Sequence, residues 1–371
     1  MIPVNTPKIG EKERINILEC IDTNWISSEG PFVKMFENNF SNYIGHKYGV
    51  AVCNGSAALD IAIKALELPE NSEIIVPTFT IISPVSSIVT NKHTPVLVDS
   101  HPNNWNMDVD QIESKITKKT KAILVVHIYG LPVKMDRIIE LANKYDLKII
   151  EDAAEMHGQE YNGKKCGSFG DVSIFSFYPN KHITTGEGGM VLTSNSDYFE
   201  KCKSYRNLCF KPEQRFVHEE IGWNYRMTNM QAALGVAQLE QIDSFIERKR
   251  EIGLKYLSGL KNIKYFEFPE HQTNYAKNIY WVFGIMVKQD SPITAKEICF
   301  KLSKKEIGTR PFFWCMHEQP VFKKMGLFKN ESYPVAENMA RNGFYIPSGL
   351  GLTDGNIDEV INNIKSIFNE F

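Results

Sequence analysis

Short β-rich apolar runs alternate with helix-like segments throughout residues 47–195, and this alternation constrains the fold more than any other feature. The segments between the runs, such as 57–66 and 135–145, have the periodicity of amphipathic helices. Buried strands separated by helices indicate a mostly parallel sheet with helices on both faces. We predict its strands at residues 48–52, 73–77, 95–98, 122–127, 148–151, 172–177 and 189–193.

The pattern changes beyond Met227, where it predicts one long helix over residues 229–255. Less regular elements follow that helix. The expected strands are 263–268 and 279–287, and the expected helices are 294–306 and 358–371. We therefore predict an α/β protein with a large domain, residues 1–245, and a smaller α+β domain, residues 246–371.

Composition narrows the possible functions. A formal net charge of −2 over 371 residues gives no reason to expect nucleic-acid binding. No apolar stretch is long enough to span a membrane, and residues 1–11 do not resemble a signal peptide. The 7 cysteines are scattered without a C-x-x-C pair, which argues against a disulfide framework and a metal site. We expect a cytoplasmic protein that binds no metal.

Ligands of parallel α/β sheets bind beyond the carboxyl ends of the strands, so those ends are the places to search for a site. Three of them carry suggestive groups. One predicted strand ends at Asp152, a second leads to Lys181 and then a glycine-rich turn, and a third passes into a helix through Gly55 and Ser56. The backbone N–H groups of Ser56 and Ala57 at that helix start could bind a phosphate, although an ordinary helix cap explains the same residues.

Lys181 and Asp152 together favour one chemistry. A lone lysine is usually a solvated surface residue, and a lone aspartate can cap a helix or bind a ribose. As a pair, they suit a carbonyl cofactor that forms a Schiff base with the amine and whose protonated pyridine ring needs a carboxylate. The glycine motifs of dinucleotide-binding and P-loop proteins are absent from the sequence.

Six motifs extend this pattern over nearly the whole chain and resemble those of the DegT/DnrJ/EryC1/StrS sugar aminotransferases. The resemblance implies the fold-type-I aminotransferase architecture and pyridoxal 5'-phosphate as cofactor. It also implies a homodimer, or a tetramer built from it, with each active site formed between two chains. The motifs lie at residues 54–59, 77–80, 151–155, 170–181, 186–190 and 222–229.

The resemblance assigns a role to each matching position. Lys181 would carry the cofactor and transfer the proton during the reaction, Asp152 would pair with the pyridinium nitrogen, and Glu155 would lie near the ring hydroxyl. Ile81 would pack against the ring, without the π-face that an aromatic residue gives many relatives at this position. The phosphate would be held by Gly55, Ser56, Ala57 and Ser176, with Asn224 and Arg226 reaching it from the neighbouring subunit.

Residues 24–28 and 309–317 are similar to the branch of this family that moves the amine of L-glutamate to C4 of GDP-4-keto-6-deoxymannose. On that resemblance, the sugar nucleotide would be bound by Trp25, Ser27, Arg310 and His317. Leu131 stands where relatives usually have Gln or His, which leaves the sugar open. The alternatives are another GDP-linked keto sugar, such as a 6-deoxyheptose, and a UDP- or dTDP-linked 4-keto-6-deoxyhexose.

Two other classes of function are weighed against an aminotransferase. In a dehydratase branch of the family, a histidine replaces the cofactor lysine, so the presence of Lys181 disfavours deoxygenation. A regulator that has kept only the fold is disfavoured by the intact pair of Lys181 and Asp152.

Overall fold

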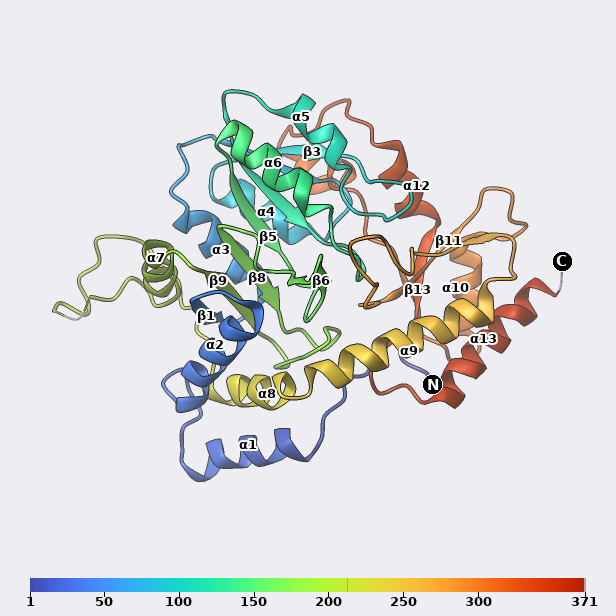
Figure 1. The fold of residues 1–371 in the computed structure, drawn as a ribbon, viewed down its shortest axis with the longest axis horizontal. Helices are drawn as coiled ribbons and strands as arrows, with labels where there is room; N and C mark the ends of the chain where they lie inside the picture. The colour runs from blue at the N-terminus through green and yellow to red at the C-terminus, as the bar shows by residue number, and fades with distance from the viewer. Residues whose placement is uncertain (212, 370–371) are drawn as a thin grey trace.

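A computed structural model of the chain describes residues 1–211 and 213–369. Its largest element is a seven-stranded sheet in which only β9 runs antiparallel to both of its neighbours (Figure 1). Across the sheet, the strands are β1 (Tyr48–Val52), β9 (Gly189–Thr193), β8 (Val172–Ser176), β5 (Lys148–Asp152), β4 (Thr120–Val126), β2 (Glu73–Pro77) and β3 (Thr94–Val98). Each of the seven predicted strands is thus present, with ends shifted by no more than two residues.

Helices cover both faces of this sheet because successive residues of its buried strands point to opposite sides. Ile74 and Val76 of β2 belong to one apolar cluster, whereas Ile75 between them belongs to the other. The first face is covered by α3 (Gly55–Ala65), α4 (Ile82–Thr90) and α7 (Ser196–Arg206). The second is covered by α2 (Pro31–Ile44), α5 (Ile112–Lys115), α6 (Met135–Tyr145) and α8 (Asn229–Leu239), with α1 (Glu11–Asp22) packed on α8.

The prediction of one helix over residues 229–255 is wrong, because α8 ends at Leu239 and α9 spans Ile242–Leu260. At Gln241 the backbone leaves helical geometry, with φ −110° and ψ 2°. Its side-chain amide and that of Gln238 both donate to the buried carboxylate of Glu13 on α1, at 2.9 and 2.6 Å. We attribute the break to this contact, which no local periodicity reveals.

A second, smaller sheet follows α9. Its order is β10 (Phe266–Glu267), β11 (Phe283–Val287), β13 (Gly343–Ile346) and β12 (Arg310–Pro311). The predicted strands 263–268 and 279–287 are therefore too long. The second one starts late because Tyr280 adopts a left-handed backbone, φ 47°, which an extended strand excludes.

Four helices belong to the C-terminal part of the chain: α10 (Ala295–Ser303), α11 (Pro320–Lys324), α12 (Pro334–Asn342) and α13 (Asp354–Phe368). Of these, α10 and α13 pack in the core of the small sheet. A two-stranded ribbon, β6 (Glu160–Tyr161) with β7 (Lys164–Lys165), lies earlier in the chain. The helices predicted at 294–306 and 358–371 correspond to α10 and α13, and residues 370 and 371 of the second prediction lie outside the described residues.

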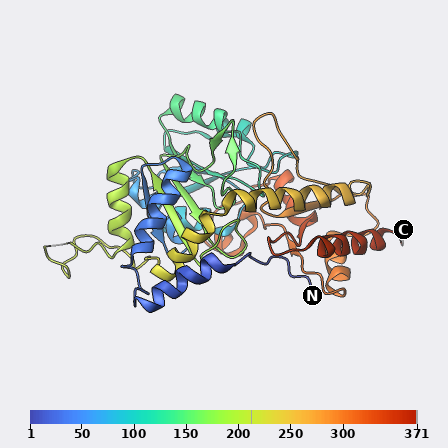
Figure 2. The same cartoon turned by 60° about the horizontal axis from the view of Figure 1, so that its bottom comes forward.

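The long helix α9 connects the two sheets (Figure 2). Phe245 near its start packs in a core cluster of the large sheet, whereas Ile252 and Tyr256 pack in the core of the small sheet. The boundary that we proposed near residue 245 therefore falls within a continuous helix. The change of environment occurs along α9 and not at a linker.

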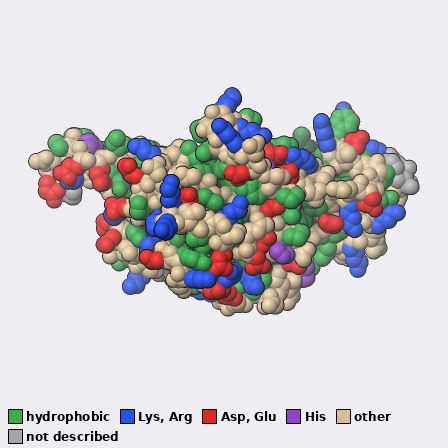
Figure 3. All heavy atoms as spheres, turned by 90° about the horizontal axis from the view of Figure 1, so that it is seen from above, with side chains coloured by type: hydrophobic (Ala, Val, Ile, Leu, Met, Phe, Trp, Pro, Cys, Tyr) green, Lys and Arg blue, Asp and Glu red, His purple; other side chains and the backbone are tan. Residues whose placement is uncertain are grey.

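A loop between α7 and α8 projects from the body of the molecule in both ribbon views (Figures 1 and 2). It carries three exposed apolar side chains, Phe216, Val217 and Ile221. Elsewhere, basic and acidic side chains are intermixed on the face seen in Figure 3. Within residues 1–211 and 213–369, no helix has both the length and the apolar character needed to cross a membrane.

We predict that Glu13→Gln lowers the free energy of unfolding by about 1–3 kcal/mol at pH 7, because the side-chain amides of Gln238 and Gln241 lose a charged acceptor. Burial alone would raise the pKa of Glu13, but hydrogen bonds from Gln238, from backbone N–H groups and from Gln241 lower it below 4.5. A carboxylate with a depressed pKa stabilises the fold above its unfolded pKa and loses that contribution as the pH falls.

Urea unfolding at several pH values therefore checks the role of Glu13. The difference between wild type and Glu13→Gln should shrink as the pH falls below 4.5. Glu11→Gln on the same helix is the control, since Glu11 pairs with Arg14 at the exposed surface. Equal losses in both variants would contradict the assigned role.

Candidate active site

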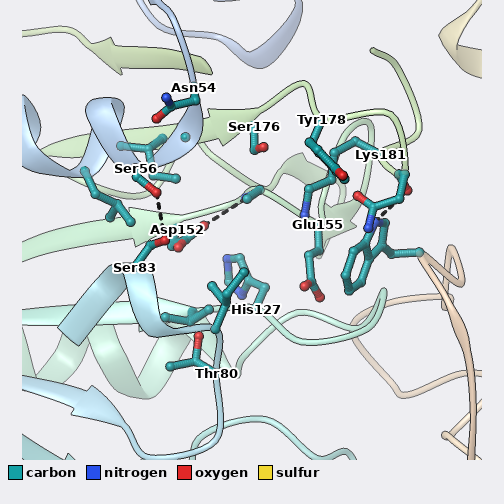
Figure 4. A pocket seen from close by; sticks show the side chains of 18 of the residues that line it. Asn54, Ser56, Thr80, Ser83, His127, Asp152, Glu155, Ser176, Tyr178 and Lys181 are labelled. Atoms are coloured by element: carbon teal, nitrogen blue, oxygen red, sulfur yellow. Dashed lines mark hydrogen bonds between the residues drawn. The ribbon is translucent and has the colours of Figure 1, made fainter. Parts of the chain in front are cut away.

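The carboxyl edge of the large sheet forms one wall of a cavity of about 350 Å³. Asp152 ends β5 and Ser176 ends β8, so these neighbouring parallel strands bring both side chains to the same edge. Figure 4 shows Asp152 next to Ser56 and Ser83, with Ser176, Glu155 and Lys181 farther along the same cavity. The predicted site residues that line the cavity are Gly55, Ser56, Ile81, Asp152, Glu155, Ser176 and Lys181.

The start of α3 forms the end of the cavity that the sequence predicted for a phosphate. Asn54 caps the helix, and its side-chain oxygen accepts the N–H of Ala57 at 2.8 Å. The N–H of Ala57 is therefore already used, and Ala57 does not line the cavity, so its predicted role as a phosphate donor is not supported. Ser56, whose hydroxyl is 2.8 Å from that of Ser83 on α4, lines the cavity.

Gly55 allows the chain to approach β8 closely. A Cβ atom placed on Gly55 would lie 2.9 Å from the Cβ of Ser176, closer than real contacts allow. The absence of a side chain at position 55 thus keeps open the space between the helix start and Ser176. A phosphate fits the chemistry of this corner, which offers hydroxyl groups and the positive end of a helix dipole.

Asp152 presents a carboxylate to the cavity in a nearly water-free setting. One oxygen accepts the N–H of Ala154 at 3.1 Å, and the other accepts no hydrogen bond from the described residues. Burial raises the pKa of Asp152 to about 6, against the lowering effects of that hydrogen bond and of Lys181. A cation placed beside the free oxygen would stabilise the ionised form.

Lys181 reaches the cavity from the turn that follows β8. Its amine lies 4.1 Å from the centre of the Trp281 ring. Burial lowers the pKa of Lys181, and the nearby carboxylates of Glu155 and Asp152 oppose that effect. Glu155 accepts the N–H of Tyr129 at 2.7 Å, and burial raises the pKa of its carboxyl group. The site therefore favours a neutral, nucleophilic lysine amine more than a surface position would.

His127 is a lining residue that sequence reasoning missed. Its Nδ1 accepts the N–H of Val133 at 3.0 Å, so Nε2 carries the proton and donates to Glu151 at 3.1 Å. Glu151 also accepts three backbone N–H groups of the 167–170 loop, and this carboxylate is completely buried. His127 is the last residue of the predicted strand 122–127. Ligands bind beyond the carboxyl ends of such strands, so a search of this strand end would have identified His127 as well.

Sequence reasoning also missed three aromatic lining residues from the C-terminal third of the chain, and no local signal could have found them. They are Trp281, Phe313 and Tyr345. Trp281 stacks at 21° to Phe313, and Tyr345 belongs to β13 of the small sheet. These side chains reach the cavity only because the small sheet packs beside the large one.

The structure does not bring the remaining predicted site residues into the cavity. Arg226 donates to Asn207 at 2.7 Å. His317 is buried, and its two ring nitrogens contact Thr78 at 2.8 Å and Glu337 at 3.1 Å. His317 therefore has no free nitrogen for a sugar nucleotide. The other predicted residues outside the cavity are exposed: Trp25, Ser27, Asn224 and Arg310.

Comparisons with known proteins agree with this arrangement. The model of the DegT/DnrJ/EryC1/StrS aminotransferase family matches residues 7–365. GDP-perosamine synthases of Escherichia coli O157:H7 and Vibrio cholerae are 40% and 37% identical over 369 residues, which cover 100% of this chain and 99% and 100% of theirs. A Streptococcus pneumoniae protein assigned as a sugar aminotransferase, solved in its PLP form, superimposes with a TM-score of 0.92 at 26% identity, covering 100% and 99% of the two chains.

Fold and site thus define a pyridoxal-phosphate-dependent aminotransferase. The chain belongs to the DegT/DnrJ/EryC1/StrS aminotransferase family. The fold class, the enzyme class and the cofactor predicted from the sequence are confirmed. The assignment of individual residues within the site stays a prediction.

We predict that Gly55→Ala raises the dissociation constant for pyridoxal phosphate by about tenfold or more, because the added methyl group pushes Ser176 away from the helix start. Fluorescence titration of the cofactor-free protein measures the change. Gly10→Ala is the control, since Gly10 also lies at the start of a helix but a Cβ there approaches only Glu13, at 3.5 Å. Equal affinities in the two variants would contradict a phosphate site between the start of α3 and Ser176.

Proposed function

We propose that this enzyme transfers the amino group of L-glutamate to C4 of a nucleotide-linked 4-keto-6-deoxy sugar, and that the sugar is GDP-4-keto-6-deoxymannose, giving GDP-perosamine. The placement of Lys181 and Asp152 in one cavity carries the aminotransferase chemistry. The full-length relatives at 37–40% identity, which are GDP-perosamine synthases, support the choice of sugar.

Bound pyridoxal phosphate supplies an aldehyde that exchanges with an amine and a ring that accepts electrons. In this proposal, Lys181 would hold the cofactor through its amine and would move the proton at the substrate carbon. Asp152 would face the ring nitrogen with its free oxygen, and Glu155 would face the ring hydroxyl. Ser56 and Ser176 would hold the phosphate, and His127 and Ile81 would contact the ring.

The sugar nucleotide is proposed to enter from the aromatic side of the cavity. Trp281, Phe313 and Tyr345 provide faces on which a sugar ring can pack. Arg310 on β12 lies opposite Tyr345 in the small sheet and is exposed, so its guanidinium is available for a diphosphate. We do not assign sugar-nucleotide binding to His317, because both of its ring nitrogens already contact other side chains.

We further propose a cytoplasmic homodimer in which Asn224 and Arg226 complete the partner's phosphate corner. Neither residue lines the cavity of its own chain. The apolar side chains of the projecting loop, including Phe216 and Ile221, are 79% and 80% exposed, and such side chains are usually covered at an interface. All 7 cysteines are free thiols, which suits a reducing compartment.

The choice of sugar is tested with a panel of GDP-, UDP- and dTDP-linked 4-keto sugars, hexoses and heptoses. We expect glutamate to convert the enzyme to its aminated form first, and GDP-4-keto-6-deoxymannose to give the highest kcat/KM in the second half-reaction. Lys181→Ala should lose at least about 10³-fold in rate, as the loss of a proton-transferring group does. A higher kcat/KM for a UDP- or dTDP-linked sugar would overturn the proposed substrate while leaving the aminotransferase class intact.

Subunit complementation tests the shared active site. Lys181→Ala and Arg226→Ala chains are each expected to have little activity as homodimers. Mixed dimers should recover activity, since one of their two sites would contain both native residues. Arg250→Ala is the control, because Arg250 lies on α9 and does not line the cavity. Homodimers of this variant should already be active without a second chain. Confirmed heterodimers without recovered activity would show that Arg226 does not act across an interface.

A further inference from the structure

The ammonium group of Lys249, a residue of α9, is buried without a counter-ion. Its side chain is 2% exposed, and it forms no ion pair with the residues that the structure describes. Instead, Nζ donates to the backbone carbonyl oxygens of Trp281, at 2.7 Å, and Ser348, at 2.5 Å. Burial lowers the pKa of Lys249 to about 7. A methionine would fill similar space without the desolvation of an amine, so packing alone does not account for a lysine here.

The two carbonyl groups belong to segments that lead into the small sheet. Trp281 precedes β11, and Ser348 follows β13. The hydroxyl of Ser348 also accepts the N–H of Phe283, at 3.3 Å. Lys249 therefore fixes the main chain of Trp281 at the point where the chain leaves the left-handed residue Tyr280, φ 47°. Without this donor, two buried carbonyl groups would lack their lysine partner.

Trp281 is in turn held against the proposed reactive lysine at two points. Its indole N–H donates to the carbonyl oxygen of Asn180, the residue before Lys181, at 2.8 Å. Its ring lies over the Lys181 amine, 4.1 Å from Nζ to the ring centre. A continuous series of contacts thus runs from the ammonium group on α9, through the main chain and ring of Trp281, to the amine in the cavity.

We propose that Lys249 is a positioning residue for the amine of Lys181, acting through Trp281, whose ring it holds over that amine. The proposal rests on the assigned role of Lys181 in transamination. It requires that the ring both limits the freedom of the Lys181 side chain and keeps water from the amine. Loss of Lys249 then exposes the amine and widens its range of orientations, and small misplacements of a reacting group slow reactions strongly.

Lys249→Met is the primary test, with Lys249→Arg as the conservative variant. In the cofactor-free protein, the pH dependence of labelling on the Lys181 peptide reports the pKa of its amine without any need for activity. We expect this pKa to rise toward its ordinary value in Lys249→Met and to be restored in Lys249→Arg. In the loaded enzyme, the glutamate half-reaction should slow by about tenfold in Lys249→Met, with KM little changed.

Ile252→Ala is the stability control, because Ile252 is buried on the same helix but packs in the core cluster of the small sheet, and Trp281 packs in another. It should lower the melting temperature while leaving the pKa and labelling of Lys181 unchanged. If Lys249→Met behaves in the same way, lowering stability alone, Lys249 is a structural residue and the proposal is wrong.

Trp281→Leu separates action through the ring from a direct effect of the charge on Lys249. It should reproduce the changes at Lys181, and adding Lys249→Met to it should produce no further change. A full effect of Lys249→Met in the Trp281→Leu background would overturn the proposal. So would an unchanged Lys181 pKa in Trp281→Leu, whether or not Lys249→Met folds. Absence of transamination in the wild type would refute the proposed function, while the labelling experiments would still decide this role of Lys249.

Discussion

One cavity brings together the buried carboxyl groups of Asp152 and Glu155 and the half-buried amine of Lys181, and this is the constraint on which the site depends. Each group loses hydration there, and the structure compensates only in part. Lys181 lies near two carboxylates, Asp152 accepts one backbone N–H, and Glu155 accepts another. The charged and hydrogen-bonding atoms that lack a protein partner face the cavity, where they can interact with a cationic ring and an aldehyde.

The order of strands in the large sheet makes this burial possible. β5 lies between β4 and β8, so Asp152 has His127 on one side and Ser176 on the other. Glu151, one residue earlier, points to the opposite face and secures the loop that leads to β8 with a completely satisfied carboxylate. Neighbouring carboxylates on one strand thus have different roles because alternation along the strand gives them different surroundings.

The second sheet adds what the first cannot supply. Its segments bring three aromatic side chains over the cavity, and α9 packs on the cores of both sheets. The errors in the predicted elements occur at this junction. The helix predicted over 229–255 breaks where Glu13 of α1 binds two glutamines, and the strand predicted from 279 begins late because Tyr280 turns left-handed. The first of these deviations arises from a contact between segments that are distant in the sequence.

The sequence by itself determined the strands of the large sheet, the family, and seven of the residues that line the cavity. Local features sufficed for these, because apolar alternation identifies strands and the strand ends carry Asp152 and Lys181. Tertiary structure alone decided that both ring nitrogens of His317 contact Thr78 and Glu337, and that the ring of Trp281 covers the amine of Lys181. Whether a polar group is free for a ligand depends on partners far away in the chain, and the local sequence does not specify those partners.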